Sequence, residues 1–147
     1  MGRAVVWSGR IALEKERLTN MAGHNDIPVY PKVWGEEHWI VNEKYCGKKL
    51  VLKGGYRCSV HYHKVKDETF YVIAGRILLE LDGEARVLEP GDKVHVGIGQ
   101  KHRFTGLVDS EMIEFSTHHE EEDSYRDSES GKVGGDEFKA LCDQYIQ

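Results

Sequence analysis

The sequence lacks the features that define several classes of protein. Its 147 residues include only 3 cysteines, Cys46, Cys58 and Cys142, and no C-x-x-C pair. An odd number at this spacing does not build a disulfide framework or a thiolate zinc site, so free thiols in a reducing compartment, the cytoplasm, are the simplest interpretation. No apolar run approaches the length of a membrane span, and the apolar start is interrupted too soon to be a secretory signal.

An excess of positive charge is also missing. The chain has 20 lysines and arginines against 25 aspartates and glutamates, and its net charge is −5. This balance gives no electrostatic reason to bind nucleic acid or an acidic membrane surface. The length predicts a single domain that can bury a substantial core. We therefore expect a small-molecule partner, with neither nucleic acid nor membrane involved.

Short strands separated by turn signals dominate the middle of the sequence. Asp82-Gly83 lies between two apolar stretches and predicts a tight hairpin. The segment 69–73 is apolar on both faces, which predicts a strand covered on both sides, with Glu68, Phe70 and Val72 facing inward. Many short strands of this kind predict an all-β sandwich or barrel.

The two ends of the chain differ from this middle. Residues 1–33 are interpreted as an N-terminal arm, in which 11–18 fit a short helix or an edge strand, and residues 34–119 as the β-barrel. An acidic loop follows at 120–134. Residues 135–147 are predicted to form a helix that packs on the barrel or on another chain, because apolar residues recur at helical spacing. That stripe consists of Phe138, Leu141, Cys142, Tyr145 and Ile146.

Three histidines and one glutamate predict a mononuclear metal site. His61 and His63 are two residues apart on a predicted strand, so their side chains share a face. Glu68 opens the next strand, and His102 follows a later glycine-rich turn. A nitrogen-rich set with one oxygen suits a divalent transition metal such as Mn, Fe, Zn, Co or Ni rather than Ca or Mg. Four ligands leave one or two positions open on a five- or six-coordinate metal, as catalysis requires.

The spacing of these ligands resembles the cupin superfamily. The motif G-x5-HxH-x(3,4)-E-x6-G fits from Gly55 to Gly75, and the motif G-x5-PxG-x2-H-x3-N fits from Gly91. Two positions depart from the second motif: Gly97 replaces the usual proline and Gly106 the usual asparagine. Neither is a ligand in the family. The resemblance implies a cupin jelly-roll β-barrel, a metal held by the four predicted ligands, and a homodimer.

A looser resemblance extends over about residues 33–126 to the cupin domain of type II phosphomannose isomerases. It is carried by Trp34-Gly35, the segment 48–59, His102-Arg103-Phe104, Ile113-Glu114-Phe115 and the acidic segment 122–126. His61 stands where that family more often has glutamine, and the nucleotidyltransferase domain of its bifunctional members is absent from this sequence. The resemblance implies a small sugar isomerase of the D-lyxose or mannose-6-phosphate type and leaves the substrate open.

Residues near these motifs are expected to determine which reaction the site performs. An aldose–ketose isomerase moves a proton between adjacent carbons through a metal-stabilised enediol. Glu114 is the predicted base; its neighbours Ile113 and Phe115 are expected to face the core, and Glu114 either the pocket or water. Arg57, four residues before His61, is expected on the ligand face, where it would hold a phosphate or carboxylate and support catalysis. The predicted substrate contacts are Lys53, Arg103 and Phe70.

Two other functions remain open at this point. The same three-histidine, one-glutamate set serves Fe- or Ni-dependent dioxygenases, and a cupin can also bind a carbohydrate without turning it over. Because a fold alone does not select among these, the first interpretation is a metal-dependent cupin that isomerises or epimerises a sugar or sugar phosphate.

Overall fold

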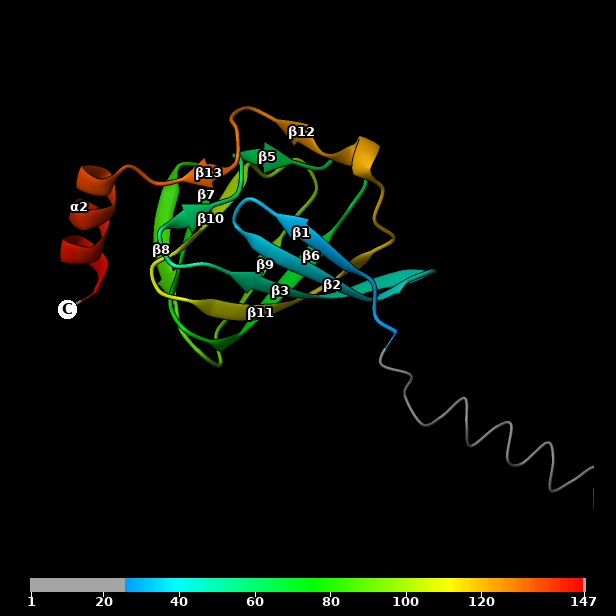
Figure 1. Ribbon diagram of the computed structural model, residues 1–147. Helices are drawn as coiled ribbons and strands as arrows, with labels where there is room; N and C mark the ends of the chain where they lie inside the picture. Colours follow the sequence, from blue (N-terminus) through cyan, green and yellow to red (C-terminus); the bar gives the residue numbers. More distant parts are fainter. Residues whose placement is uncertain (1–25, 147) are drawn as a thin grey trace, which may run out of the picture.

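Two antiparallel β-sheets face each other in the computed structural model, which describes residues 26–146 (Figure 1). The long-stranded sheet consists, in spatial order, of β1 (Val29–Lys32), β2 (Gly35–Asn42), β3 (Tyr45–Leu52), β11 (Ser110–Thr117), β6 (Glu68–Ala74) and β9 (Lys93–Val96). The short-stranded sheet consists of β12 (Tyr125–Arg126), β5 (His61–Tyr62), β10 (His102–Gly106), β4 (Tyr56–Arg57), β13 (Gly131–Lys132), β7 (Ile77–Leu81) and β8 (Glu84–Leu88). The predicted all-β sandwich is confirmed.

Alternation along the strands places the core between the sheets. In β6, Glu68, Phe70 and Val72 are buried as predicted, because residues two apart share one face of a strand. The prediction that β6 is covered on both sides is not met by a second sheet within this chain, where Tyr71 and Ile73 are each 43% exposed on the outer face; cover by a partner subunit stays a prediction. The inward set is joined by Leu50, Leu52, Ile77, Leu79, Phe104 and Met112. Each fully buried side chain of this size contributes about 1.5–3 kcal/mol.

Two tight connections depend on residues that tolerate positive φ. The predicted hairpin between β7 and β8 turns at Asp82 and Gly83, with φ of 49° and 87°, as a type I′ turn requires. Gly75 ends β6 at a φ of 86°, and a Cβ there would lie 2.2 Å from the Ser110 hydroxyl. Only glycine fits this close approach, which brings β7 back across the core.

The N-terminal part of the described chain is more regular than the sequence suggests. β1 pairs with β2 from Val29↔His38 to Lys32↔Gly35, so the sheet begins within the segment interpreted as an arm. The segment 11–18, for which a short helix or an edge strand is expected, lies outside the described residues.

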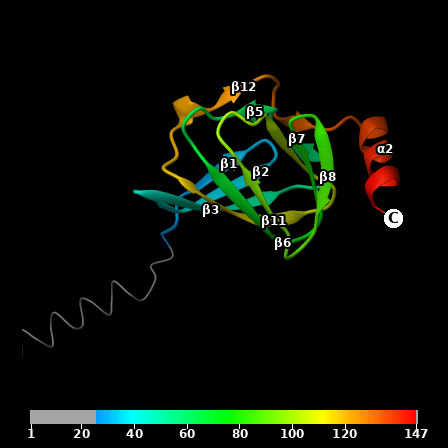
Figure 2. The same cartoon turned by 180° about the vertical axis from the view of Figure 1, so that it is seen from behind.

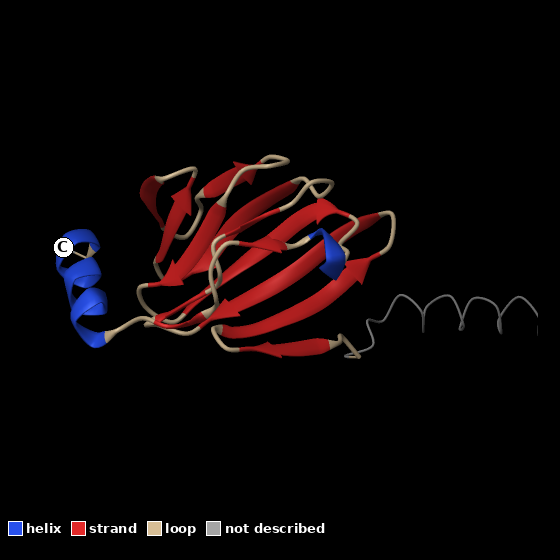
Figure 3. Cartoon of the chain, turned by 90° about the horizontal axis from the view of Figure 1, so that it is seen from above, coloured by secondary structure: helices blue, strands red, loops and turns tan. Residues whose placement is uncertain are grey.

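The predicted C-terminal helix is present as α2 (Gly135–Tyr145) and lies beside one end of the sandwich (Figures 2 and 3). The Phe138 ring lies over Gly55, 3.7 Å from the place a Cβ would take. The rest of its apolar stripe is only partly covered. Among residues 26–146, no helix has both the length and the hydrophobicity needed to cross a membrane. A 3-10 turn, η1 (Glu121–Asp123), precedes β12.

Candidate metal centre

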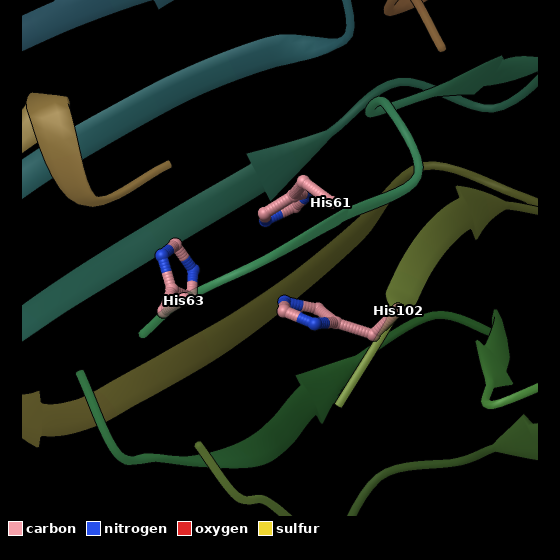
Figure 4. Close-up of side chains that lie close together, drawn as sticks. All are labelled: His61, His63 and His102. Atoms are coloured by element: carbon pink, nitrogen blue, oxygen red, sulfur yellow. The ribbon is translucent and has the colours of Figure 1, made fainter. Parts of the chain in front are cut away.

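Three histidines from neighbouring segments of the short-stranded sheet point toward one another (Figure 4). His61 on β5 lies directly opposite His102 on β10, and their ring centroids are 4.3 Å apart. His63, just after β5, lies 5.2 Å from His61 and 5.6 Å from His102 by the same measure. One ring nitrogen of each lies within 4.8 Å of the others, so these three side chains can hold one metal ion.

Backbone carbonyls fix the proton on the far nitrogen of each ring. The Nδ1 atoms of His61, His63 and His102 donate to the carbonyls of Ser59, Asp123 and Gln100 at 2.8, 2.9 and 3.0 Å. A carbonyl only accepts, so each Nδ1 carries the hydrogen and each Nε2 presents a lone pair. Hydrogen bonds of this kind orient histidines that bind metals.

Unpartnered buried atoms mark the place between these rings. Within residues 26–146, Nε2 of His63, Nε2 of His102 and Oε2 of Glu68 are buried without a hydrogen-bond partner. Glu68, the first residue of β6, approaches from the opposite sheet, 3.5 Å from His63 Nε2 and 3.3 Å from His102 Nε2. Leaving several such atoms unpaired costs free energy that a bound cation would recover. The three imidazoles fit a divalent transition metal, and Glu68 lies beside two of them, outside the group whose ligand atoms are all within 4.8 Å of one another.

Burial keeps the histidines in the form that binds a metal. Desolvation, with His102 beside it, lowers the pKa of His61 to about 3, and burial also lowers the pKa of His63. Burial alone would raise the pKa of Glu68, but His102, Lys66 and His63 together lower it. At neutral pH these groups are two neutral imidazoles and a carboxylate.

The glycine-rich turn before His102 connects the two halves of the site. Gly99 N donates to the His63 carbonyl at 2.7 Å. At Gly97, where the cupin motif usually has proline, the amide donates to Gln100 Oε1 at 2.7 Å, a bond that proline could not make. At Gly106, a Cβ would lie 2.6 Å from the Lys53 carbonyl, so the asparagine of the motif would not fit. Both departures thus have a local structural reason.

The site opens into a cavity of about 710 Å³ between the sheets. This volume is in the range of small-molecule sites, roughly 300–1,000 Å³. Its apolar wall includes Trp34, Phe70 and Phe104, and its polar wall includes Glu114. Phe70 is therefore in a position to contact a substrate.

Residues 49–118 match the family model described as the cupin domain. The chain contains a cupin domain. A cupin solved from Shewanella frigidimarina and described as RmlC-like has the same fold, with a TM-score of 0.62 at 18% identity over 69% of this chain and 92% of that one. The two-sheet architecture is thus the cupin jelly roll.

Curated relatives match only in part. CurC of Streptomyces cyaneus, named a polyketide synthase, is 36% identical over 42% of this chain and 40% of its own length. Mannose-1-phosphate guanylyltransferase of Salmonella montevideo is 28% identical over 69% of this chain and 22% of its own length. The chain thus spans less than half of either relative.

Glu114 lies inside the cupin cavity. Its carboxylate is buried, and Oε1 accepts from Lys66 Nζ and Ser116 Oγ at 3.0 Å each. The expectation that Ile113 and Phe115 face the core is wrong: Met112 and Glu114 point inward, and Phe115 is 57% exposed.

Arg57 lies away from the cavity, and its expected place on the His61 face is wrong. Tyr56 and Cys58 pack against the core, so Arg57 points outward from β4 and pairs with Glu137 of α2 at 2.6 Å. The break between β4 and β5 shifts the alternation before His61.

The other two predicted basic contacts also lie outside the residues that line the cupin cavity. Arg103 makes a two-pronged pair with Glu80, at 2.6 and 2.8 Å. Lys53 is exposed, and its ammonium lies 5.9 Å from the centre of the Tyr56 ring.

The acidic segment after β11 forms a strap, residues 120–130, along the cupin cavity. The Asp123 carboxylate accepts from the amides of Lys64, Val65 and Lys66 at 2.8–3.2 Å. Ser128 and Ser130 bind the amides of Val60 and Ser59 at 2.8 and 2.9 Å. The strap therefore fixes the ligand-bearing segment and lines part of the cavity.

Sequence reasoning missed three buried polar members of the cupin cavity, Lys48, Lys66 and His119. The ammonium of Lys66 contacts Glu68, and burial would lower its pKa, but Glu114 and Glu68 more than offset this and raise it. Its two-residue spacing from Glu68 was the available signal, since such residues share a face. His119 lies 3.3 Å from Lys66 Nζ, and its place at a strand end gave no signal.

Proposed function

We propose that this protein is a metal-dependent cupin that acts on a sugar or sugar phosphate, as an aldose–ketose isomerase or epimerase. The observation that carries the proposal is the buried Glu114 carboxylate in the same cavity as the three-histidine cluster. Lys66 bridges Glu114 to Glu68, so the prospective base lies next to the prospective ligand. Proton transfer beside a metal is the chemistry that such an isomerisation requires.

Each part of the site then has a defined task. His61, His63, His102 and Glu68 would hold the metal, which when bound polarises a sugar carbonyl and stabilises negative charge on its oxygen. In an isomerase Glu114 takes a proton from one carbon and returns it to the next on the same face; an epimerase would need a second proton donor on the opposite face. Lys66 and Ser116 fix its Oε1 in place.

The charges around the cavity favour a neutral sugar over a phosphorylated one. Four cationic side chains line it among the described residues: Lys32, Lys48, Lys66 and Arg126. Six carboxylates oppose them: Glu37, Glu68, Glu114, Glu121, Asp127 and Glu129. One divalent metal would bring the lining close to neutral, and little positive charge would remain to hold a phosphate. The name of the guanylyltransferase relative supports a hexose, although the sugar in that name is phosphorylated.

The deciding experiment follows hydrogen exchange into sugars. The protein, loaded separately with Mn, Fe, Co, Ni or Zn, is incubated in D2O with a panel of free and phosphorylated aldoses and ketoses. NMR then records deuterium at the carbon next to the carbonyl, together with the isomer formed. Solvent deuterium in an isomerised sugar is the expected result. No exchange and no isomer with any metal removes the proposal.

Matched variants assign the roles. At a saturating concentration of metal, Glu114→Gln should lose at least about 100-fold in turnover, the lower end for a general base. Glu111→Gln, an outward-facing carboxylate on the same strand, should turn over normally. His61→Ala should lose both metal and activity, and full metal retention in that variant would contradict the ligand assignment.

Two other functions would be recognised by two further measurements on the same metal-loaded protein. Oxygen uptake with the Fe or Ni protein and a phenolic, thiol or diketone substrate would indicate the dioxygenase. Sugar-dependent thermal stabilisation with the sugar recovered unchanged would indicate a binding module.

A further inference from the structure

Lys66 is a buried cation between two buried carboxylates. Its ammonium contacts Glu68 Oε1 and lies 3.0 Å from Glu114 Oε1, and all three side chains are at most 5% exposed. Water does not screen charges at this depth, so the position of the ammonium strongly affects any cation bound beside Glu68. In the isomerisation scheme above Lys66 orients Glu114, and its contact with Glu68 has no assigned task.

The two oxygens of Glu68 are in different environments. Oε1 contacts Lys66 and lies 3.5 Å from His63 Nε2, whereas Oε2 is buried, has no hydrogen-bond partner among residues 26–146 and lies 3.3 Å from His102 Nε2. Both oxygens therefore face the histidine cluster, but only Oε2 is free of the ammonium group.

We infer that Lys66 is a positioning residue that holds Glu68 as a one-oxygen metal ligand. The inference rests on the metal-binding part of the proposed function. An oxygen that accepts from an ammonium group has less negative charge to offer a metal, so Glu68 would bind the metal mainly through Oε2. One coordination position thereby stays open for a substrate oxygen. The cost is affinity, because the ammonium repels a divalent cation bound to the other oxygen.

The same geometry predicts opposite effects for the two neighbours of this contact. Removing the Lys66 charge leaves the carboxylates of Glu68 and Glu114 facing the site, and a metal would neutralise them, so binding should tighten. Replacing Glu114 by glutamine leaves Lys66 with Glu68 as its remaining carboxylate contact. The ammonium then competes more strongly for Glu68, and metal binding should weaken.

The test is a Co²⁺ titration of the wild-type protein and of Lys66→Met, Glu114→Gln and Lys48→Met. Affinity is measured by competition with a chelator, and coordination by visible absorption. Lys48→Met is the matched control, because Lys48 is equally buried in the same cavity but its carboxylate partner is Glu37, at 3.3 Å. No sugar is involved, so the readout is independent of turnover.

Lys66→Met should bind Co²⁺ about 10–100-fold more tightly, the range for partners that orient a ligand. Its bands should weaken as the coordination number rises with a second Glu68 oxygen. Glu114→Gln should bind Co²⁺ more weakly than the wild type. Lys48→Met should match the wild type in both affinity and absorption spectrum.

The inference is overturned if folded Lys66→Met binds Co²⁺ with unchanged or weaker affinity. It is also overturned if Lys48→Met gains as much Co²⁺ affinity as Lys66→Met, because any buried positive charge would then have the same effect. If Lys66→Met does not fold, Glu114→Gln decides, and unchanged affinity there overturns it. If wild type binds no Co²⁺, the metal centre and this inference both fall. Wild-type binding with an unaffected Lys66→Met removes the inference and leaves the proposed function standing.

Discussion

The inner face of the long-stranded sheet buries charged groups among its apolar side chains, while the outer face exposes apolar side chains. On the inside, Lys48 and Glu114 lie opposite each other on β3 and β11, and both are buried. On the outside, Tyr71, Ile73 and Phe115 are each more than 40% exposed. Burial of charge is tolerated only where each charge has a partner, so the inner face is organised around ion pairs that an ordinary core would not need. Buried ion pairs of this kind are more typical of a functional site than of a region that only supports the fold.

The largest expected effect tests whether those inner charges depend on one another. Glu37→Ala leaves the 1%-exposed Lys48 without the carboxylate that lies 3.3 Å from it. Stranding a buried charge costs about 3–5 kcal/mol, and urea denaturation should show this loss in the free energy of unfolding. The control is Glu36→Ala, on the same strand but half-exposed, which should change it by less than about 0.5 kcal/mol. Equal losses in both variants would remove the distinction between the faces.

A smaller effect should depend on pH. Burial would raise the pKa of Glu37, but Lys48, Trp39 and Lys32 more than offset this and hold it below the ordinary value of 4.5. A carboxylate with a lowered pKa adds stability that is fully present above its unfolded pKa and is lost as the pH falls through the folded value. Between pH 6 and about pH 3, wild type should therefore lose more unfolding free energy than Glu37→Gln. The prediction is contradicted if the free energy of unfolding falls equally with pH in the wild type and in Glu37→Gln.

The smallest effect is expected on the outer face. Phe115→Ser replaces a 57%-exposed ring and should change the unfolding free energy of the monomer by less than about 0.5 kcal/mol. The homodimer stays a prediction, and sedimentation equilibrium of wild type and Phe115→Ser tests it. A wild-type dimer that the substitution dissociates would show that this face is covered in solution, and a monomer in both cases would contradict the expected dimer.

The sequence predicted the parts of the molecule that depend on local spacing. His61 and His63, Glu68 at the start of a strand, and the turn at Asp82-Gly83 follow from alternation and turn chemistry, so the fold and the gathered ligand set could be anticipated. Arg57 was misplaced because the strand breaks between it and His61, and a break does not show in a count of residues.

The remaining differences come from contacts between distant segments. The orientation of β11 was inverted because apolar residues were expected inside, whereas Lys66, nearly fifty positions earlier, stabilises Glu114 there. The strap along the cavity depends on Asp123 meeting amides almost sixty positions away. The local sequence of either segment does not predict such a distant partner.

Asp123 joins two parts of the structure that lie far apart in the sequence. Its side chain holds the amides of residues 64–66, and its own carbonyl accepts the Nδ1 hydrogen of His63. Any movement that detaches this residue therefore also releases one ring of the metal centre. Attachment of the strap and metal affinity are thermodynamically linked: an ion that holds His63 in place also favours the attached strap, by the same free energy with which attachment favours the ion.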